Sequence, residues 1–367
     1  MSFLRRISSV VLLTGAVIAC SPTTQAPKIT DAASAEEARR QRELAIRERV
    51  TLDQRLQAVA WRVRTSNVEL CDDSVHAEAG MKTMVQEDDW PDFRPALLSL
   101  YGIQDQATIL HTIVGGPAHL AGLKTGDVLL ELDGQAVPGG KKGNEFLTEK
   151  IGESTGAVNL KIRRGQDEPV ITLHPLQTCS FPVFLAANDA VNAFADGDKV
   201  HVTTGMMSFV GSDDELALII GHELAHNAMN HIGKQRGNRM AGYIVGSVLD
   251  VFLGGTGAFA RLGEQVAAGV HAQDFEEEAD YVGVYYAARA GYDVKGAADL
   301  WRRMATSNPT AIHLAGSTHP STAKRFLGVE ATADEVVRKV AEGEPVRPNE
   351  SKDKEDAPSP DAVSFDG

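Results

Sequence analysis

One hexapeptide, GHELAH at positions 221–226, constrains the fold of this chain more than any other stretch. Ser212, three acidic residues and an apolar run precede it, an order that predicts a capped and buried helix. Residues four apart share a helix face, so His222 and His226 can offer imidazole nitrogens to one zinc ion. Glu223 lies beside them, placed to take a proton from a water that the metal activates. The alternative is a core helix with two hydrogen-bonded histidines and a chance match.

A catalytic zinc needs a third protein ligand, and the stretch FEEEADYVG at 275–283 is the best candidate to supply it. Its apolar residues recur with helical spacing, and Glu276 and Asp280 are four apart and share a face. One carboxylate can bind the metal while the other accepts a hydrogen bond from a ligand histidine. The alternative is a solvated acidic face, which is usual for three consecutive glutamates seen alone.

The N-terminus has the pattern of an export signal. Two arginines precede an apolar stretch, 10–18, which is too short to span a bilayer as a mature helix. It ends in Val-Ile-Ala-Cys, which resembles a bacterial lipoprotein cleavage box. The resemblance implies removal of residues 1–19 and lipidation of Cys20, and Ser21 favours the outer membrane. A plain secretory signal peptide is the alternative. We expect residues 20–34 to form a flexible tether.

Chain length and net charge limit the classes of protein to which this chain can belong. A chain of 367 residues can hold two compact domains plus tails, and 43% hydrophobic residues is ordinary for a soluble globular protein. The net charge of −14 argues against nucleic acid as a partner, because nothing would neutralise its phosphates.

The segment 35–96 is expected to be helical, with an amphipathic helix near 35–64 that packs on the protein body. A membrane-surface helix is disfavoured because acidic and basic residues are mixed.

The cysteine count suggests one disulfide. Without Cys20, two of the three cysteines remain, Cys71 and Cys179, an even pair in an oxidising compartment. We therefore predict a disulfide that closes the loop around the central module. Two separate buried thiols are the alternative.

The run 115–134 resembles the central signature of a PDZ domain. Pro117 and Gly122 bound a short helix, and a Thr-Gly-Asp turn and a strand follow. We expect this module over 97–175. PDZ domains add an extended peptide to a sheet edge and hold its carboxylate with backbone amides. The candidates for that carboxylate loop are Tyr101, Gly102 and Ile103. A purely structural PDZ-like module is the alternative.

The pattern of His222-Glu223-x-x-His226 followed by Glu276-x-x-x-Asp280 resembles the zinc metallopeptidase family that includes HtpX and the CAAX prenyl proteases. Asn192-Ala193, the Ser-Thr-His-Pro-Ser stretch at 317–321 and Arg325 also match, so the resemblance covers roughly 183–327. It implies one zinc ion per chain. The implied ligands are His222, His226 and Glu276.

The same resemblance implies roles for the neighbouring residues. Glu223 would be the general base, and Asp280 would orient a ligand histidine. The family's late histidine maps to His319, which would stabilise the developing oxyanion or occupy the open zinc position in a latent state. Arg325 is expected to form only a structural ion pair.

The expected fold class is α+β. A mainly helical, zincin-type domain with a small sheet would cover 176–341, after the β-rich module and before a disordered acidic tail at 342–367. The strand around 199–204 is expected to present an edge on which extended substrate aligns.

The expected function is zinc-dependent cleavage of unfolded or misassembled envelope proteins. The enzyme would lie in the periplasm, lipid-anchored through Cys20 at the inner face of the outer membrane. The alternative is a peptide-binding or chaperone-like PDZ lipoprotein with a latent zinc site. A prenyl-protein processing enzyme is disfavoured because it would need several membrane-spanning helices.

Overall fold

The computed structural model describes residues 24, 26–253, 260–262, 264–265, 272–307 and 323–350. The chain divides into two compact units, residues 1–45 and 46–367. Two of the predicted site residues, Cys20 and His319, lie outside the described residues. In the described part of the chain, no helix is both long enough and apolar enough to cross a bilayer.

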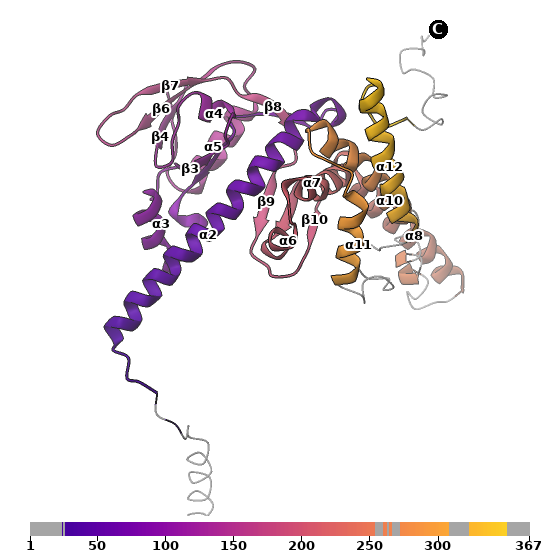
Figure 1. The fold of residues 1–367 in the computed structure, drawn as a ribbon, viewed down its shortest axis with the longest axis horizontal. Coiled ribbons are helices and arrows are strands. Elements are labelled where there is room, and N and C mark those ends of the chain that lie inside the picture. Colours follow the sequence, from indigo (N-terminus) through magenta and orange to yellow (C-terminus); the bar gives the residue numbers. More distant parts are fainter. Residues whose placement is uncertain are drawn as a thin grey trace, which may run out of the picture. The chain divides into compact units, whose positions relative to one another are not determined.

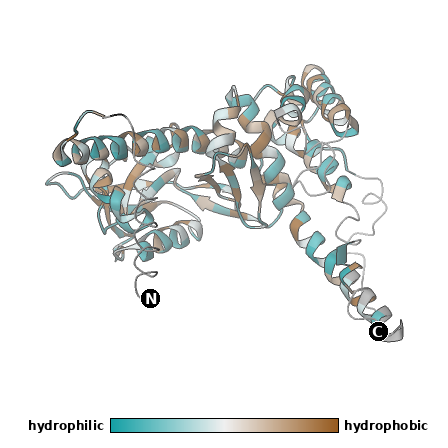
Figure 2. Ribbon diagram, turned by 90° about the horizontal axis from the view of Figure 1, so that it is seen from below, coloured by the Kyte–Doolittle hydropathy of each residue, from teal (hydrophilic) through white to brown (hydrophobic). Residues whose placement is uncertain are grey.

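A long helix, α2 (Asp31–Ser66), forms where the sequence has many charged residues and neither glycine nor proline (Figure 1). Much of the helix is hydrophilic (Figure 2). Within the second unit it buries apolar residues at helical spacing, namely Ile46, Val50, Leu56, Val59 and Val63. The amphipathic helix expected near 35–64 is therefore present, and this part of it packs on the protein body.

An antiparallel sheet of six strands has the order β2-β3-β4-β6-β7, with β5 paired to β4. The strands are β2 (Met81–Met84), β3 (Thr108–Thr112), β4 (Val128–Leu132), β5 (Gln135–Ala136), β6 (Val158–Arg163) and β7 (Val170–Leu173). Helices α4 (Pro117–Leu120) and α5 (Lys141–Gly152) belong to the same part of the chain. Its core consists of fully buried aliphatic side chains such as Ile109, Leu129 and Leu160.

The elements expected within 97–175 lie where the sequence predicts them, but the sheet also takes a strand from outside that range. Strand β2 comes from the segment that the sequence analysis expects to be helical. It pairs with β3 through the register Met81 to Thr112 and Met84 to Thr108. β2 is an end strand of the sheet, and within the described residues no strand pairs with its second edge.

A second, smaller pairing ties the end of α2 to the C-terminal half of the chain. After the short helix η1 (Val68–Leu70), strand β1 (Val75–Glu78) pairs antiparallel with β8 (Leu176–Cys179). The structure has a disulfide between Cys71 and Cys179, whose Cα atoms are 5.7 Å apart. Arg64 of α2 donates hydrogen bonds to the Cys179 carbonyl and the Glu78 carboxylate.

The C-terminal half begins with a three-stranded sheet of order β10-β11-β9. Its strands are β9 (Val183–Ala186), β10 (Ala193–Ala195) and β11 (Val200–Thr203). β10 and β11 form an antiparallel pair, while β9 lies parallel to β11 on its other side. The prediction that the strand around 199–204 presents a free edge is therefore wrong. β11 is the central strand because β9 pairs with its second edge.

Helices follow this sheet in the chain, and α6 and α7 pack on it (Figure 1). They are α6 (Thr204–Phe209), α7 (Asp213–Ala228), α8 (His231–Leu253), α10 (Ala272–Arg289), α11 (Ala297–Ser307) and α12 (Ala323–Glu342). Helix α7 packs on β10 and β11 and also contacts α10, which in turn packs against α12. The described chain thus mixes helices and sheets.

Candidate metal centre

Helix α7 carries the GHELAH motif and begins where the sequence predicts. The Oγ atom of Ser212 accepts a hydrogen bond from the backbone N–H of Glu215 at 3.2 Å, which caps the helix. Three acidic residues then occupy the first turn, where the helix dipole favours negative charge. Every residue from 216 to 227 is buried, including Glu223. The motif histidines are therefore held on a helix that is packed on all sides.

A close crossing of α7 and α10 brings the acidic helix to the motif. A Cβ atom on Gly221 would lie 2.5 Å from the carbonyl oxygen of Gly283, and one on Gly283 would lie 2.7 Å from the backbone nitrogen of His222. Both distances are too short for any side chain, so glycine at both positions lets the two backbones touch. Glu276 lies two turns before Gly283 on α10 and so reaches the histidines.

Three buried side chains converge at this crossing. Ligand atoms of His222, His226 and Glu276 all lie within 4.8 Å of one another. The Nε2 atoms of the two histidines are 3.2 Å apart. The Oε1 atom of Glu276 lies 3.3 Å from Nε2 of His226, and its Oε2 atom lies 3.6 Å from Nε2 of His222.

These separations suit a tetrahedral zinc ion. Zinc binds histidine nitrogen and carboxylate oxygen at about 2.0–2.2 Å, so neighbouring ligand atoms of a tetrahedral site lie roughly 3.3–3.5 Å apart. Two imidazole nitrogens and one carboxylate, with a fourth position left for water, are also a known donor set of catalytic zinc. The residues present fit the metal both in distance and in chemistry.

Asp280 lies on the side of His222 away from Nε2, the place predicted for an orienting carboxylate. Its Oδ1 atom is 3.0 Å from Nδ1 of His222 and accepts a hydrogen bond from the indole N–H of Trp301 at 2.9 Å. Burial lowers the pKa of His222, although Asp280 opposes that shift. A lowered pKa favours the neutral imidazole, which is the form that binds a metal.

Arg325 forms the structural ion pair expected of it, and both of its partners are carboxylates of the site. Its guanidinium Nη1 lies 2.9 Å from Oε2 of Glu276, and its Nε and Nη2 atoms donate to Asp280 at 2.7 and 2.9 Å. Burial by itself raises the pKa of Asp280, but the hydrogen bonds from Arg325 and His222 keep it below its usual range.

The predicted peptide-carboxylate loop lies at the end of a helix instead of beside a free strand edge. After the short turns η2 (Gln86–Asp88) and η3 (Pro91–Phe93), helix α3 (Arg94–Tyr101) ends at the first of these residues. Gly102 caps it in the left-handed conformation at φ 71°, and Ile103 is buried in the core. None of the three residues lines the pocket that adjoins β2.

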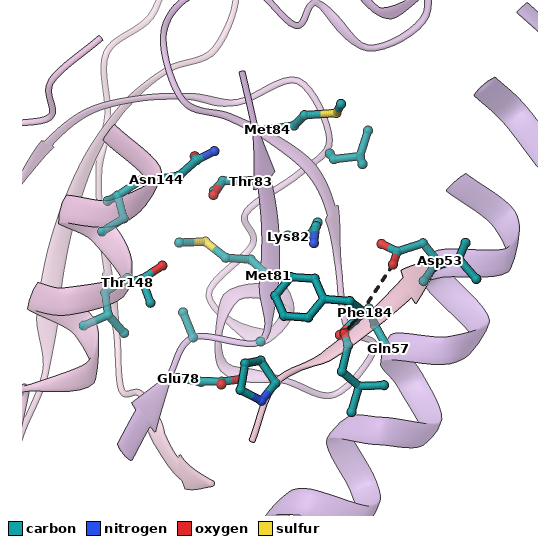
Figure 3. A pocket seen from close by; sticks show the side chains of 18 of the residues that line it. Asp53, Gln57, Glu78, Met81, Lys82, Thr83, Met84, Asn144, Thr148 and Phe184 are labelled. Atoms are coloured by element: carbon teal, nitrogen blue, oxygen red, sulfur yellow. Dashed lines mark hydrogen bonds between the residues drawn. The ribbon is translucent and has the colours of Figure 1, made fainter. Parts of the chain in front are cut away.

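That pocket has a volume of about 610 Å³ and lies between β2, α5, α2 and β9. Figure 3 shows Thr83 of β2 on the same side as Asn144 of α5, with Lys82 on the side of Phe184 and Asp53. The ammonium nitrogen of Lys82 lies 5.2 Å from the centre of the Phe184 ring. The free edge of β2 and the helix α5 therefore border a cavity that could hold a short extended segment.

Residues 174–333 match the family model of peptidase family M48. The matched range contains α7 and α10 and all three residues of the metal-ligand group. The motif-bearing part of the chain is thus similar to metallopeptidases, the class that the sequence resemblance implies.

Curated relatives are similar over the same part of the chain. The mitochondrial metalloendopeptidase OMA1 of Arabidopsis thaliana is 31% identical over 157 residues, which cover 41% of this chain and 31% of the relative. The beta-barrel assembly-enhancing protease of Yersinia pestis is 25% identical, covering 42% and 35%. The metalloprotease LoiP of Escherichia coli is 28% identical, covering 41% and 60%. The chain therefore spans less than two thirds of each of these relatives.

Among solved structures, the HtrA3 PDZ domain bound to a phage-derived ligand is 16% identical and covers 28% of this chain and 88% of its own, with a TM-score of 0.22. The HtrA-type protease AlgW with a decapeptide gives a TM-score of 0.23 at the same identity and covers 28% of this chain and 30% of its own. Likenesses at these scores are too slight to assign a fold.

Proposed function

We propose that this chain is a zinc-dependent endopeptidase of the bacterial cell envelope. The observation that carries the proposal is the triangle of ligand atoms from His222, His226 and Glu276, with separations that suit one zinc ion. The match of residues 174–333 to peptidase family M48 supports the same reading.

The residues around the triangle suit hydrolysis of a peptide bond. Zinc, when bound, supplies Lewis acidity that activates water and polarises the scissile carbonyl. Glu223, buried beside the first ligand histidine, would take the proton of the attacking water and pass it to the leaving amine. Asp280 and Arg325 hold His222 and Glu276 in place before substrate binds. The roles of His319, as oxyanion stabiliser or latent fourth ligand, stay predictions.

We propose that substrate is bound as an extended strand at β10. β10 is an end strand of the three-stranded sheet and packs directly on α7, which carries the motif. A peptide added there would be held mainly by backbone hydrogen bonds, so side-chain sequence would matter little. This kind of recognition suits unfolded or misassembled proteins, whose backbones are accessible.

The proposed location rests on the N-terminal pattern and on the disulfide. The cleavage box at Cys20 implies a lipid anchor, and Ser21 favours the outer membrane. A disulfide such as Cys71–Cys179 persists in the oxidising periplasm. The name of the Yersinia pestis relative, a beta-barrel assembly-enhancing protease, agrees with quality control of envelope proteins. We place this enzyme at the periplasmic face of the outer membrane.

We further propose that the PDZ-like part binds peptides at β2 and not at Tyr101–Ile103. The free edge of β2 borders the pocket in which Thr83 and Asn144 lie on the same side (Figure 3). This part would either recruit substrate or restrain cleavage. The competing function is that of a peptide-binding or chaperone-like protein. In that case the PDZ-like part alone would carry the function, and the zinc site would be latent.

Replacing the general base tests the proposed activity. Glu223→Gln keeps the size of the side chain but removes its basicity, so cleavage of a disordered substrate such as casein should fall by about 10²- to 10⁴-fold. Zinc content, measured on the same purified protein, should stay at one ion per chain. Glu277→Gln, at a partly exposed position of α10 where the side chain pairs with Lys324, is the matched control and should cleave normally.

Two outcomes would contradict the proposal. Unchanged turnover by Glu223→Gln would remove this residue from the reaction. Wild-type protein that binds zinc and peptides but cleaves nothing would favour the chaperone-like function with a latent metal site.

A further inference from the structure

The second ligand histidine has a neighbour that the sequence analysis did not single out. His231 is the first residue of α8 and is 1% exposed. Its Nδ1 atom lies 3.1 Å from Nδ1 of His226, and its Nε2 atom lies 2.9 Å from Oε2 of Glu278. The three side chains form a continuous chain of hydrogen bonds that leads from the metal-ligand group to the protein surface, where Glu278 is about half exposed.

Local structure fixes the position of His231. The chain turns between α7 and α8 at Asn230, which has a positive φ of 53°. This turn directs His231 back towards the last turn of α7, where His226 lies. The ring of Phe275 stacks on the His231 ring, with 4.7 Å between centroids and 20° between planes. The imidazole is therefore held on one face by an aromatic ring and at both nitrogens by hydrogen bonds.

The direction of these hydrogen bonds follows from the ligand geometry. Nε2 of His226 faces Glu276 and His222, so it is the nitrogen that would bind the metal. A neutral imidazole that binds through Nε2 carries its proton on Nδ1. Nδ1 of His226 must then donate to Nδ1 of His231, which leaves the His231 proton on Nε2. That proton is donated to the carboxylate of Glu278.

We propose that His231 and Glu278 are positioning residues for the metal ligand His226. Together they select the His226 tautomer that presents Nε2 to the metal, and they hold its ring in the binding orientation. His222 has a carboxylate, Asp280, directly on its Nδ1 side, whereas His226 reaches its carboxylate through a second imidazole. The proposal rests on the proposed zinc site but not on peptide cleavage.

The competing explanation is that His231 only fills space between α7, α8 and α10. A filler would matter for the stability of the fold and not for the hydrogen bond that it offers. The two explanations differ in what a substitution does to zinc affinity at constant fold, and in whether a smaller side chain with an acceptor atom can replace the imidazole.

The test measures zinc affinity of the full chain by competition with a chromogenic chelator. Loss of a hydrogen-bond partner of a metal ligand typically weakens metal binding by about 10- to 100-fold. The zinc affinity of His231→Ala should be lower than that of wild type by a factor in this range. His231→Asn should recover most of the loss, because its carbonyl oxygen can accept the proton of His226 Nδ1. Unfolding of the metal-free proteins is recorded alongside, to show that each variant folds.

A pair of neighbouring glutamates separates hydrogen bonding from overall charge. Glu278→Ala removes the carboxylate at the end of the hydrogen-bonded series His226–His231–Glu278 and should weaken zinc binding by about 10-fold. Glu277→Ala makes the same change in charge one residue away, where the side chain pairs with Lys324, and should leave zinc affinity unchanged. Nitrogen NMR of zinc-loaded wild type should show the proton of His226 on Nδ1.

Three results would overturn the proposal: zinc affinity of His231→Ala within twofold of wild type, equal losses in the two glutamate variants, or a proton of His226 on Nε2. Failure of the proposed peptidase function looks different. In that case zinc affinities would follow the predicted order while no variant, wild type included, cleaved casein.

Discussion

Buried arginines in this protein pair with carboxylates on other helices or strands. Arg325 on α12 bridges Glu276 and Asp280 on α10, and Arg64 at the end of α2 holds Glu78 on β1. A buried ion that loses its partner costs several kcal/mol, because the remaining charge is left without solvent or counter-charge. These pairs therefore make the site and the fold sensitive to single substitutions.

Glu78 gives a prediction about acid stability. Burial by itself would raise the pKa of Glu78, but the charge of Arg64 and hydrogen bonds from His76 and Arg64 lower it to about 2. A carboxyl with a lowered folded-state pKa stabilises the protein above its unfolded-state value, 4.5, and this stability is lost as the pH falls from 4.5 to about 2. The contribution at neutral pH is at most about 3 kcal/mol.

Comparison of wild type with Glu78→Gln measures the stability that the Glu78 carboxylate contributes at each pH. Urea unfolding at a series of pH values should show the variant to be less stable at pH 7, with the difference from wild type shrinking below pH 4.5. Glu153→Gln removes an exposed partner of Lys150, and its free energy of unfolding should stay close to that of wild type at every pH. A difference between Glu78→Gln and wild type that stays constant down to pH 3 would contradict the linkage.

Among the elements, the crossing of α7 and α10 decides whether the site exists. Helix α10 supplies both Glu276 and Asp280, and it approaches α7 closely enough only because Gly221 and Gly283 leave room for backbone contact. The glycines carry no chemistry themselves. They set the distance between a helix with two histidines and a helix with two carboxylates.

Gly283→Ala should therefore damage both the fold and the metal site. Its Cβ would lie 2.7 Å from the backbone nitrogen of His222, and such overpacking costs about 1–3 kcal/mol and would push the helices apart. Zinc affinity should fall because Glu276 moves away from the histidines.

Gly328→Ala is the matched control for this substitution. Gly328 lies within α12, and a Cβ there meets nothing within 4 Å. Alanine favours a helix over glycine, so this variant should gain about 0.5–1 kcal/mol and keep its zinc affinity. Chemical unfolding and chelator competition measure both variants. A gain in stability for both variants would contradict the prediction, because it would show that the crossing of α7 and α10 can accommodate a Cβ atom.

At the scale of the whole molecule, the disulfide joins parts of the chain that are far apart in sequence. Cys71 follows α2 and Cys179 ends β8, 108 residues later, with the six-stranded sheet between them in the chain. Both cysteines are buried in the core that also contains α7 and α10. The cross-link thus closes a long loop and anchors it on the part of the protein that carries the candidate site.

Reduction of this disulfide should lower the free energy of unfolding by about 2–5 kcal/mol, because a loop of this length gains much entropy when it is opened in the unfolded state. Urea unfolding of wild type with and without reductant isolates the cross-link, since both sulfur atoms remain. The double variant Cys71→Ala/Cys179→Ala should lose slightly more, as it also leaves a small cavity. Identical unfolding curves with and without reductant would contradict this expectation.

Local sequence determined much of this protein. The cap at Ser212 and the apolar run behind it specify α7, and the spacing of four residues places His222 and His226 on one face. Proline and glycine at the ends of a short helix, and the Thr-Gly-Asp turn after it, likewise predicted α4 and β4. Such features depend on neighbours within a few residues, so they can be read directly from the order of side chains.

Only the tertiary structure decided which distant groups meet. The convergence of Glu276 with the histidines, the bridge made by Arg325 and the chain from His226 through His231 to Glu278 depend on how the helices cross. The central place of β11 and the recruitment of β2 depend on pairing with strands elsewhere in the chain. Packing of whole elements sets these contacts, and the spacing of residues along one element carries no information about it.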